Sequence, residues 1–212
     1  MSVTGIAALA GTYHSATFTG NLSPGSANVQ APFNSVISQS GAVGGSFVFD
    51  DQLVPAAGTG YANVFFSTFP DIVNIPNATA FYLNLGGGIA FDLGSAVVEP
   101  GAIQSAAIQY KDGSFHGFFF VSDFMFQGSS YELNMQGTTF AISPIVGGYA
   151  TGQNRVTGSL NSSLSNVQSF VPTKPADSTV PEPGSYVLLG TGLAGLAVVA
   201  RMRRKRVSTL IG

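Results

Sequence analysis

The 212-residue sequence contains no cysteine and no tryptophan, and only 8% of its residues are charged. Without cysteine the chain has no disulfide framework, no thiol chemistry and no cysteine-based zinc site, so its stability must come from burial and sheet pairing. The two histidines, His14 and His116, lie about a hundred residues apart, and the spacing of a histidine-rich zinc site is absent. We therefore expect no metal and no cofactor.

Basic residues are scarce outside the C-terminal end. Residues 1–180 contain three Lys or Arg and nine Asp or Glu, a net charge of −6. Nucleic-acid-binding domains carry a basic footprint that this stretch lacks, so we expect no nucleic-acid partner. With 27 glycines and 11% aromatic residues, the composition is typical of an extracellular β-protein with many turns.

Short runs of β-branched and aromatic residues, with a period close to two, indicate strands throughout residues 11–161. The candidate strands are residues 12–20, 45–50, 61–69, 79–85, 89–93, 103–111, 114–126, 131–135, 138–142 and 155–160. Eight to ten strands at this spacing predict an all-β fold, an antiparallel β-sandwich for which a jelly roll is one possible form.

Glycine-containing turns separate these runs. Asp112-Gly113 between two strand-like runs favours a type I′ hairpin, and Gln136-Gly137 is a second candidate. Three consecutive glycines, 86–88, turn the chain between two further strands. Phenylalanines within 114–126 occur at both odd and even positions, which predicts either burial on both faces or a β-bulge.

Catalytic signals are weak. A hydrolytic triad would need His14 or His116 beside a serine and a carboxylate, and no Gly-x-Ser-x-Gly elbow occurs. Carboxylates for calcium or for a glycosidase pair could come from Asp50, Asp51, Asp92, Asp112 and Asp123. Aspartates at strand ends more commonly bond the local backbone in turns, so we expect no enzyme, with a secreted hydrolase as the weaker alternative.

A carbohydrate-binding module is a further alternative. Exposed tyrosines could stack on sugar rings, although core packing is the more common role and tryptophan is absent. The candidates are Tyr13, Tyr61, Tyr82, Tyr110, Tyr131 and Tyr149.

Both ends of the predicted domain carry other signals. Ala8-Leu9-Ala10 fits a small-x-small cleavage site, so residues 1–10 are interpreted as the remnant of a signal peptide. Residues 162–179 are rich in Ser, Asn, Pro and Thr and are predicted to be a flexible linker.

The C-terminal end has three consecutive parts within residues 180–206, followed by a short tail, 207–212. Val180, Pro181, Glu182 and Pro183 come first, and the prolines favour an extended backbone around Glu182. An uncharged apolar run, 186–200, follows; extended to 184–202 it spans roughly 28 Å as a helix, close to the roughly 30 Å hydrocarbon core. We therefore predict a single C-terminal transmembrane helix. A basic cluster ends this region: Arg201, Arg203, Arg204, Lys205 and Arg206.

This order of parts resembles the PEP-CTERM sorting signal of Gram-negative bacteria. By the positive-inside tendency the basic cluster stays cytoplasmic and residues 1–183 lie on the far side. The resemblance implies export, transient retention in the inner membrane, recognition by an exosortase-type membrane enzyme, and an association with exopolysaccharide. The sequence thus predicts a non-enzymatic protein of the cell envelope or extracellular matrix, with a simple membrane anchor as the alternative for the tail.

Overall fold

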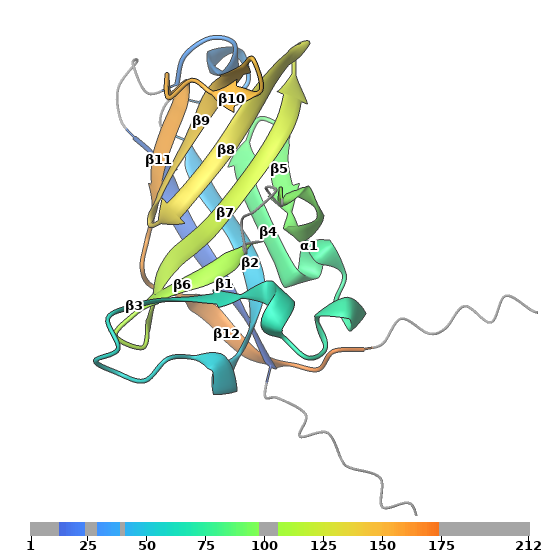
Figure 1. The fold of residues 1–212 in the computed structure, drawn as a ribbon, viewed down its shortest axis with the longest axis vertical. Coiled ribbons are helices and arrows are strands. Elements are labelled where there is room, and N and C mark those ends of the chain that lie inside the picture. Colours follow the sequence, from blue (N-terminus) through green and yellow to red (C-terminus); the bar gives the residue numbers. More distant parts are fainter. Residues whose placement is uncertain (1–12, 24–28, 39–40, 98–105, 174–212) are drawn as a thin grey trace, which may run out of the picture. The chain divides into compact units, whose positions relative to one another are not determined.

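The computed structural model describes residues 13–23, 29–38, 41–97 and 106–173. All of them lie in the first of two units into which the chain divides, residues 1–173 and 174–212. The described part is mostly β, with little helix (Figure 1). Its strands are β1 (Tyr13–Leu22), β2 (Ala42–Asp50), β3 (Tyr61–Phe65), β4 (Phe81–Gly86), β5 (Ile89–Asp92), β6 (Ala107–Lys111), β7 (Ser114–Phe126), β8 (Ser129–Gly137), β9 (Thr139–Val146), β10 (Tyr149–Ala150), β11 (Val156–Leu160) and β12 (Ser165–Phe170).

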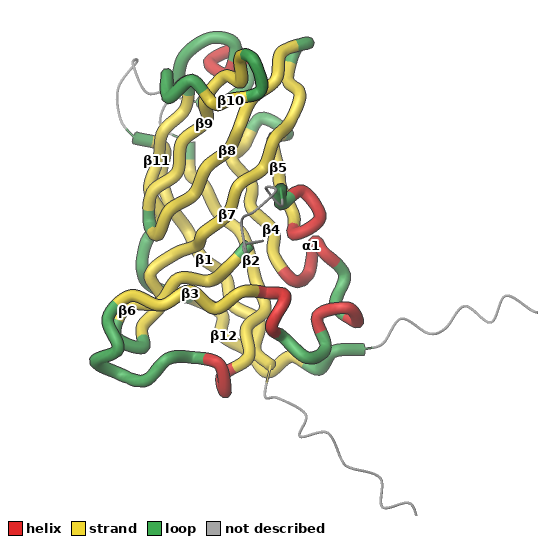
Figure 2. The backbone as a smooth tube through the Cα atoms, viewed as in Figure 1, coloured by secondary structure: helices red, strands yellow, loops and turns green. Residues whose placement is uncertain are grey.

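Helical turns are short and belong to the connections between strands (Figure 2). One α-helical turn, α1 (Asn77–Ala80), precedes β4. The 3-10 helices are Phe33–Ser35, Asp51–Leu53, Phe66–Thr68, Ile72–Asn74 and Leu93–Ser95.

The strands form one continuous antiparallel sheet in the order β3-β6-β7-β8-β9-β11-β1-β2-β4-β5. Strand β10 adds to β9, and β12 pairs with the first half of β1. The antiparallel all-β prediction is therefore confirmed. In place of the two facing sheets of the predicted sandwich, the structure has one long sheet that curls so that distant strands face one another.

Aromatic rings fill the inside of the curl. Phe118 of β7 packs against Phe18 of β1, Phe47 of β2 and Phe81 of β4, with ring centroids 4.8, 5.0 and 4.9 Å apart. Towards the end of the sheet, Phe91 of β5 meets Phe124 of β7 edge to face at 5.1 Å. These contacts join strands that are not neighbours in the sheet, and burying each ring contributes about 1.5–3 kcal/mol. Packing of these aromatic rings therefore stabilises the curled shape of the sheet.

The predicted hairpin at Asp112-Gly113 is confirmed. Both residues have positive φ, 50° and 79°, as a type I′ turn requires, and they join β6 to β7. A second turn of this kind, Gln127-Gly128 between β7 and β8, has φ of 48° and 79°. The sequence pattern had not indicated that turn, because glutamine is uncommon at a position with positive φ.

The bulge alternative for the phenylalanines of β7 is also confirmed. The register between β6 and β7 shifts between Gln109 and Tyr110, so that Gln109 faces Gly117 while Tyr110 faces Phe115. The extra residue changes the side-chain parity, and Phe115, Phe118 and Phe120 are all buried.

The ordered chain continues past residue 161, where the sequence predicted a linker. Strand β12 occupies Ser165–Phe170 and pairs with β1, and the Oγ atoms of Thr17 and Ser165 lie 2.8 Å apart. Five of the six side chains of β12 are exposed, so hydrogen bonds of the backbone and of hydroxyl groups are what mainly hold β12 against β1. Because this strand buries almost none of its side chains, its residues are polar, and this polar composition indicated a linker.

Candidate functional site

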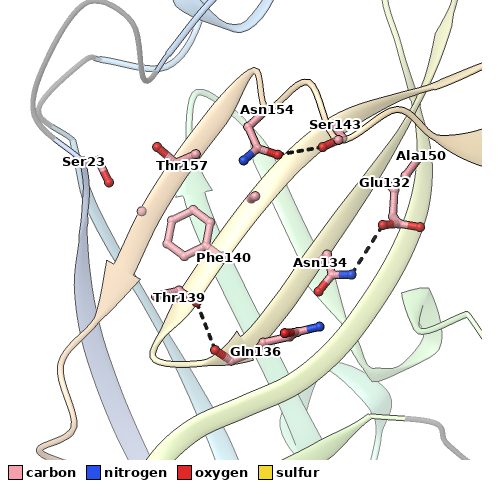
Figure 3. A pocket seen from close by; sticks show the side chains of 13 residues that line it. Ser23, Glu132, Asn134, Gln136, Thr139, Phe140, Ser143, Ala150, Asn154 and Thr157 are labelled. Carbon is pink, nitrogen blue, oxygen red and sulfur yellow. Dashed lines mark hydrogen bonds between the residues drawn. The ribbon is translucent and has the colours of Figure 1, made fainter.

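A polar hollow lies on the outer face of three adjacent strands, β8, β9 and β11 (Figure 3). In β8 the side chains of Leu133 and Met135 are fully buried in the core, so the alternate residues Glu132, Asn134 and Gln136 face outward. All three line the hollow, whose volume is about 540 Å³. The same alternation places hydroxyl-bearing residues of β9 and β11 on this face.

Ala141 of β9 forms the floor of the hollow. Asn134 of β8 lies opposite it on one side, and Thr157 of β11 lies opposite it on the other. Because the alanine side chain is a single methyl group between two longer polar ones, the outer face is depressed at this point. The next outward residues of β9, Thr139 and Ser143, stand before and after Ala141 along the strand.

The hairpin from β9 to β10 builds the upper rim. Gly147 and Gly148 have positive φ and turn the chain back, and β10 pairs with the end of β9. The returning chain is held against β9 by the Arg155 N–H, which donates to the Ile142 carbonyl at 2.7 Å. Asn154 is thereby placed over Ser143, whose Oγ lies 2.9 Å from Asn154 Oδ1. The amide nitrogen of Asn154 points away from Ser143 (Figure 3).

The groups that face the hollow are mostly uncharged. Amides come from Asn134, Gln136 and Asn154, and Glu132 contributes the single carboxylate among the lining residues that the structure describes. Two further contacts fix the positions of these side chains. The Asn134 Nδ2 atom lies 3.5 Å from Glu132 Oε1, and Thr139 Oγ1 donates to the Gln136 carbonyl at 3.0 Å. Both amides and hydroxyls can donate and accept hydrogen bonds, so the hollow suits a neutral polar ligand.

Neither histidine lies in this hollow. His14 Nε2 is 3.5 Å from Asp51 Oδ2, and its ring stacks on Phe49 with centroids 5.4 Å apart. His116 instead meets the exposed ring of Tyr61 edge to face at 5.1 Å.

The candidate aspartates serve mainly in turns and caps. Asp50 Oδ1 accepts from the Gln52 N–H, and Asp112 Oδ1 accepts from the Gly60 N–H. Asp92 forms a reciprocal capping box with Ser95. Within the described residues, no three His, Cys, Asp or Glu side chains come together as a potential metal site.

The candidate tyrosines divide between core and surface. Tyr13, Tyr110 and Tyr131 are buried, as the core interpretation predicted, whereas Tyr61 and Tyr149 are exposed. Burial raises the pKa of the Tyr110 hydroxyl above its ordinary value. The hollow itself was missed from sequence, although the alternation Glu132-x-Asn134-x-Gln136 beside buried apolar residues was a usable signal for a polar outer face.

The tail predictions fall on residues 174–212, which lie outside the described residues. These include Val180, Pro181, Glu182 and Pro183, the basic residues from Arg201 to Arg206, and the predicted transmembrane helix. In the part of the chain that is described, no helix has the length and hydropathy needed to span a bilayer.

Comparison with known proteins places the tail in a defined class. A family model described as the PEP-CTERM protein-sorting motif matches residues 179–205. The C-terminal end of the chain thus carries a PEP-CTERM sorting motif, as its resemblance indicated. The motif marks it for export and for sorting by an exosortase-type membrane enzyme toward the cell envelope. No curated protein and no solved structure matches the chain.

Proposed function

We propose that this is a non-enzymatic protein of the cell envelope or extracellular matrix, displayed after sorting and associated with exopolysaccharide. The observation that carries the proposal is the sorting motif at residues 179–205, which follows a charge-poor β-domain without cysteine. Glu182, whose flanking prolines favour an extended backbone, is the residue that the membrane enzyme recognises.

Two further parts of the tail have distinct roles in this proposal. The apolar run 186–200 holds the chain in the inner membrane as a helix while it is being sorted. The basic residues from Arg201 to Arg206 remain cytoplasmic and fix the orientation, because clustered Lys and Arg oppose translocation.

The chemistry of the β-domain supports a non-enzymatic function. Within the described part of the chain, the hollow offers Glu132 as its single carboxylate, whereas glycoside hydrolysis uses two carboxyl groups flanking the scissile bond. His14 and His116 make contacts on other strands, at Asp51 and Tyr61 respectively. Inactivity of the purified protein on panels of polysaccharides and esters is expected, and turnover of any of them would contradict this part of the proposal.

Cell fractionation of three forms of the protein tests the sorting proposal. The forms are the full chain, a chain truncated after Thr179, and a control truncated after Arg206 that keeps all three parts of the tail. We expect the full chain and the control to distribute alike, and the chain that ends at Thr179 to leave the membrane and outer-envelope fractions. Identical distribution of all three would show that the tail does not direct sorting.

A further inference from the structure

The hollow of β8, β9 and β11 presents an ordered grid of hydrogen-bonding side chains. Strands in a sheet lie about 4.8 Å apart, and alternate residues along a strand about 6.8 Å apart. Asn134, Ala141 and Thr157 form one row across the three strands, and Gln136 with Thr139 forms a parallel row. Because the side chains stand on paired backbone, the grid is preorganised.

The backbone of these strands is already occupied. Strand β9 pairs with β8 on one side and with β11 on the other, so its N–H and C=O groups are engaged in the sheet. A peptide that binds by strand addition needs a free edge. A ligand of this hollow must therefore meet side-chain amides and hydroxyls, which match a molecule that carries many hydroxyl groups.

The charge of the hollow selects against anions. Among the described residues that line it, none is Lys, Arg or His, and the single ionisable group is the Glu132 carboxylate. A carboxylate accepts hydrogen bonds and repels a negatively charged polymer. The volume of about 540 Å³ falls within the range of about 300–1,000 Å³ usual for ligand sites.

We propose that this hollow binds a segment of a neutral polysaccharide, with Ala141 as its floor and Asn134, Gln136, Asn154 and Thr157 as its hydrogen-bonding partners. The inference deepens the proposed function, since it names the surface by which the sorted domain meets a matrix polymer. Recognition through amides and hydroxyls replaces the tyrosine stacking suggested by the sequence, because none of those six tyrosines is among the described residues that line the hollow. Single contacts are weak, and several domains on one polymer would add avidity.

Affinity electrophoresis of the purified full chain tests the proposal. The gels contain dextran, mannan, a soluble galactan, or the neutral exopolysaccharide fraction of the cells that produce the protein, and alginate serves as the anionic comparison. We expect retardation by at least one neutral polymer and none by alginate. Absence of retardation in every neutral gel, or retardation by alginate alone, would overturn the proposal.

Two substitutions connect binding to the hollow. Ala141→Tyr fills the floor of the hollow with a bulky side chain, and tyrosine is a residue type that is common in strands. We expect at least a tenfold loss of affinity for the neutral polysaccharide. Ala42→Tyr is the matched control: Ala42 is exposed on the outer face of β2, two strands beyond β11 in the sheet order, and its substitution should leave binding unchanged. Equal loss in the two variants would place binding elsewhere.

A third variant distinguishes a loss of binding from a loss of folding. Asn134→Ala removes hydrogen-bonding atoms without adding bulk, and a loss of about fivefold to tenfold is expected from one or two hydrogen bonds. Thermal unfolding followed by circular dichroism should give the same Tm for Asn134→Ala and the unmodified chain. Unchanged affinity of this folded variant would contradict the assignment. Because binding is measured on purified protein, its failure is distinguishable from a failure of sorting, which is measured in cells.

Discussion

The ring of Phe118 in β7 packs on the ring of Phe18 in β1 with centroids 4.8 Å apart. Strands β1 and β7 are separated by three others in the sheet order, β8, β9 and β11, so this contact spans the inside of the curl. Both side chains are buried to within 1% exposure. The contact shows that one sheet supplies both walls of its own core.

Replacing Phe118 should therefore destabilise the domain strongly. Phe118→Ala removes a ring that contacts Phe18, Phe47 and Phe81, and about 3–5 kcal/mol of unfolding free energy should be lost. Chemical denaturation measures this loss. Phe119→Ala on the outer face is the control, because Phe119 is only half-buried and should cost less than half as much. Equal costs for the two would contradict the curled core.

Gly117 should tolerate no side chain. Its φ is 111°, and a Cβ there would collide with the carbonyl group of Gly137 in the neighbouring strand β8. We expect Gly117→Ala to lower the unfolding free energy by about 3 kcal/mol or more.

The matched control for this prediction is Gly128→Ala. Gly128 also has positive φ, 79°, but its Cβ would have no neighbour within 4 Å. The Gly128→Ala variant should therefore lose only about 1–2 kcal/mol of unfolding free energy, which is the conformational cost of a side chain at positive φ. Similar losses in the two variants, measured by denaturation, would show that close approach of β7 and β8 is unimportant.

The stability of the domain should fall in alkaline solution. The folded-state pKa of Tyr110 is raised by burial above the value of about 10 expected in the unfolded chain. The folded state therefore holds the phenolic proton more tightly than the unfolded chain does. The contribution of this proton to the unfolding free energy is complete below pH 10 and is lost as pH rises above 10. Urea denaturation at pH 8, 10 and 11 measures the decline.

Tyr110→Phe separates this effect from general alkaline denaturation. The phenylalanine keeps the ring but has no ionisable group, so the decline above pH 10 should become shallower. Tyr149→Phe is the control, because Tyr149 is 80% exposed. If both variants decline as steeply as the unmodified chain, burial of Tyr110 does not govern the alkaline limit.

Local features of the fold were predictable because they depend on a few consecutive residues. Asp112-Gly113 suits a turn with two positive φ values, and the structure places a hairpin there. The phenylalanines of residues 114–126 broke the alternation of a simple strand, which indicated either burial on both faces or a bulge, and the bulge lies at His116, between Phe115 and Gly117.

The arrangement of the strands was not predictable in this way. Which strands become neighbours depends on contacts such as Phe18 with Phe118, between residues far apart in the sequence. Strand β12 has too little buried surface to show a strand pattern. The hollow depends on the register that places Ala141 between Asn134 and Thr157, and register follows from the assembled sheet.

Intact mass spectrometry of the protein recovered from the cell envelope and medium shows whether the C-terminal motif directs processing by a membrane enzyme. We predict a mass that corresponds to a chain ending near Pro183, without the apolar run and the basic cluster. Glu182→Ala should leave the tail attached and the protein in the inner membrane. Recovery of envelope or released protein that still carries Arg201–Arg206 would contradict the account.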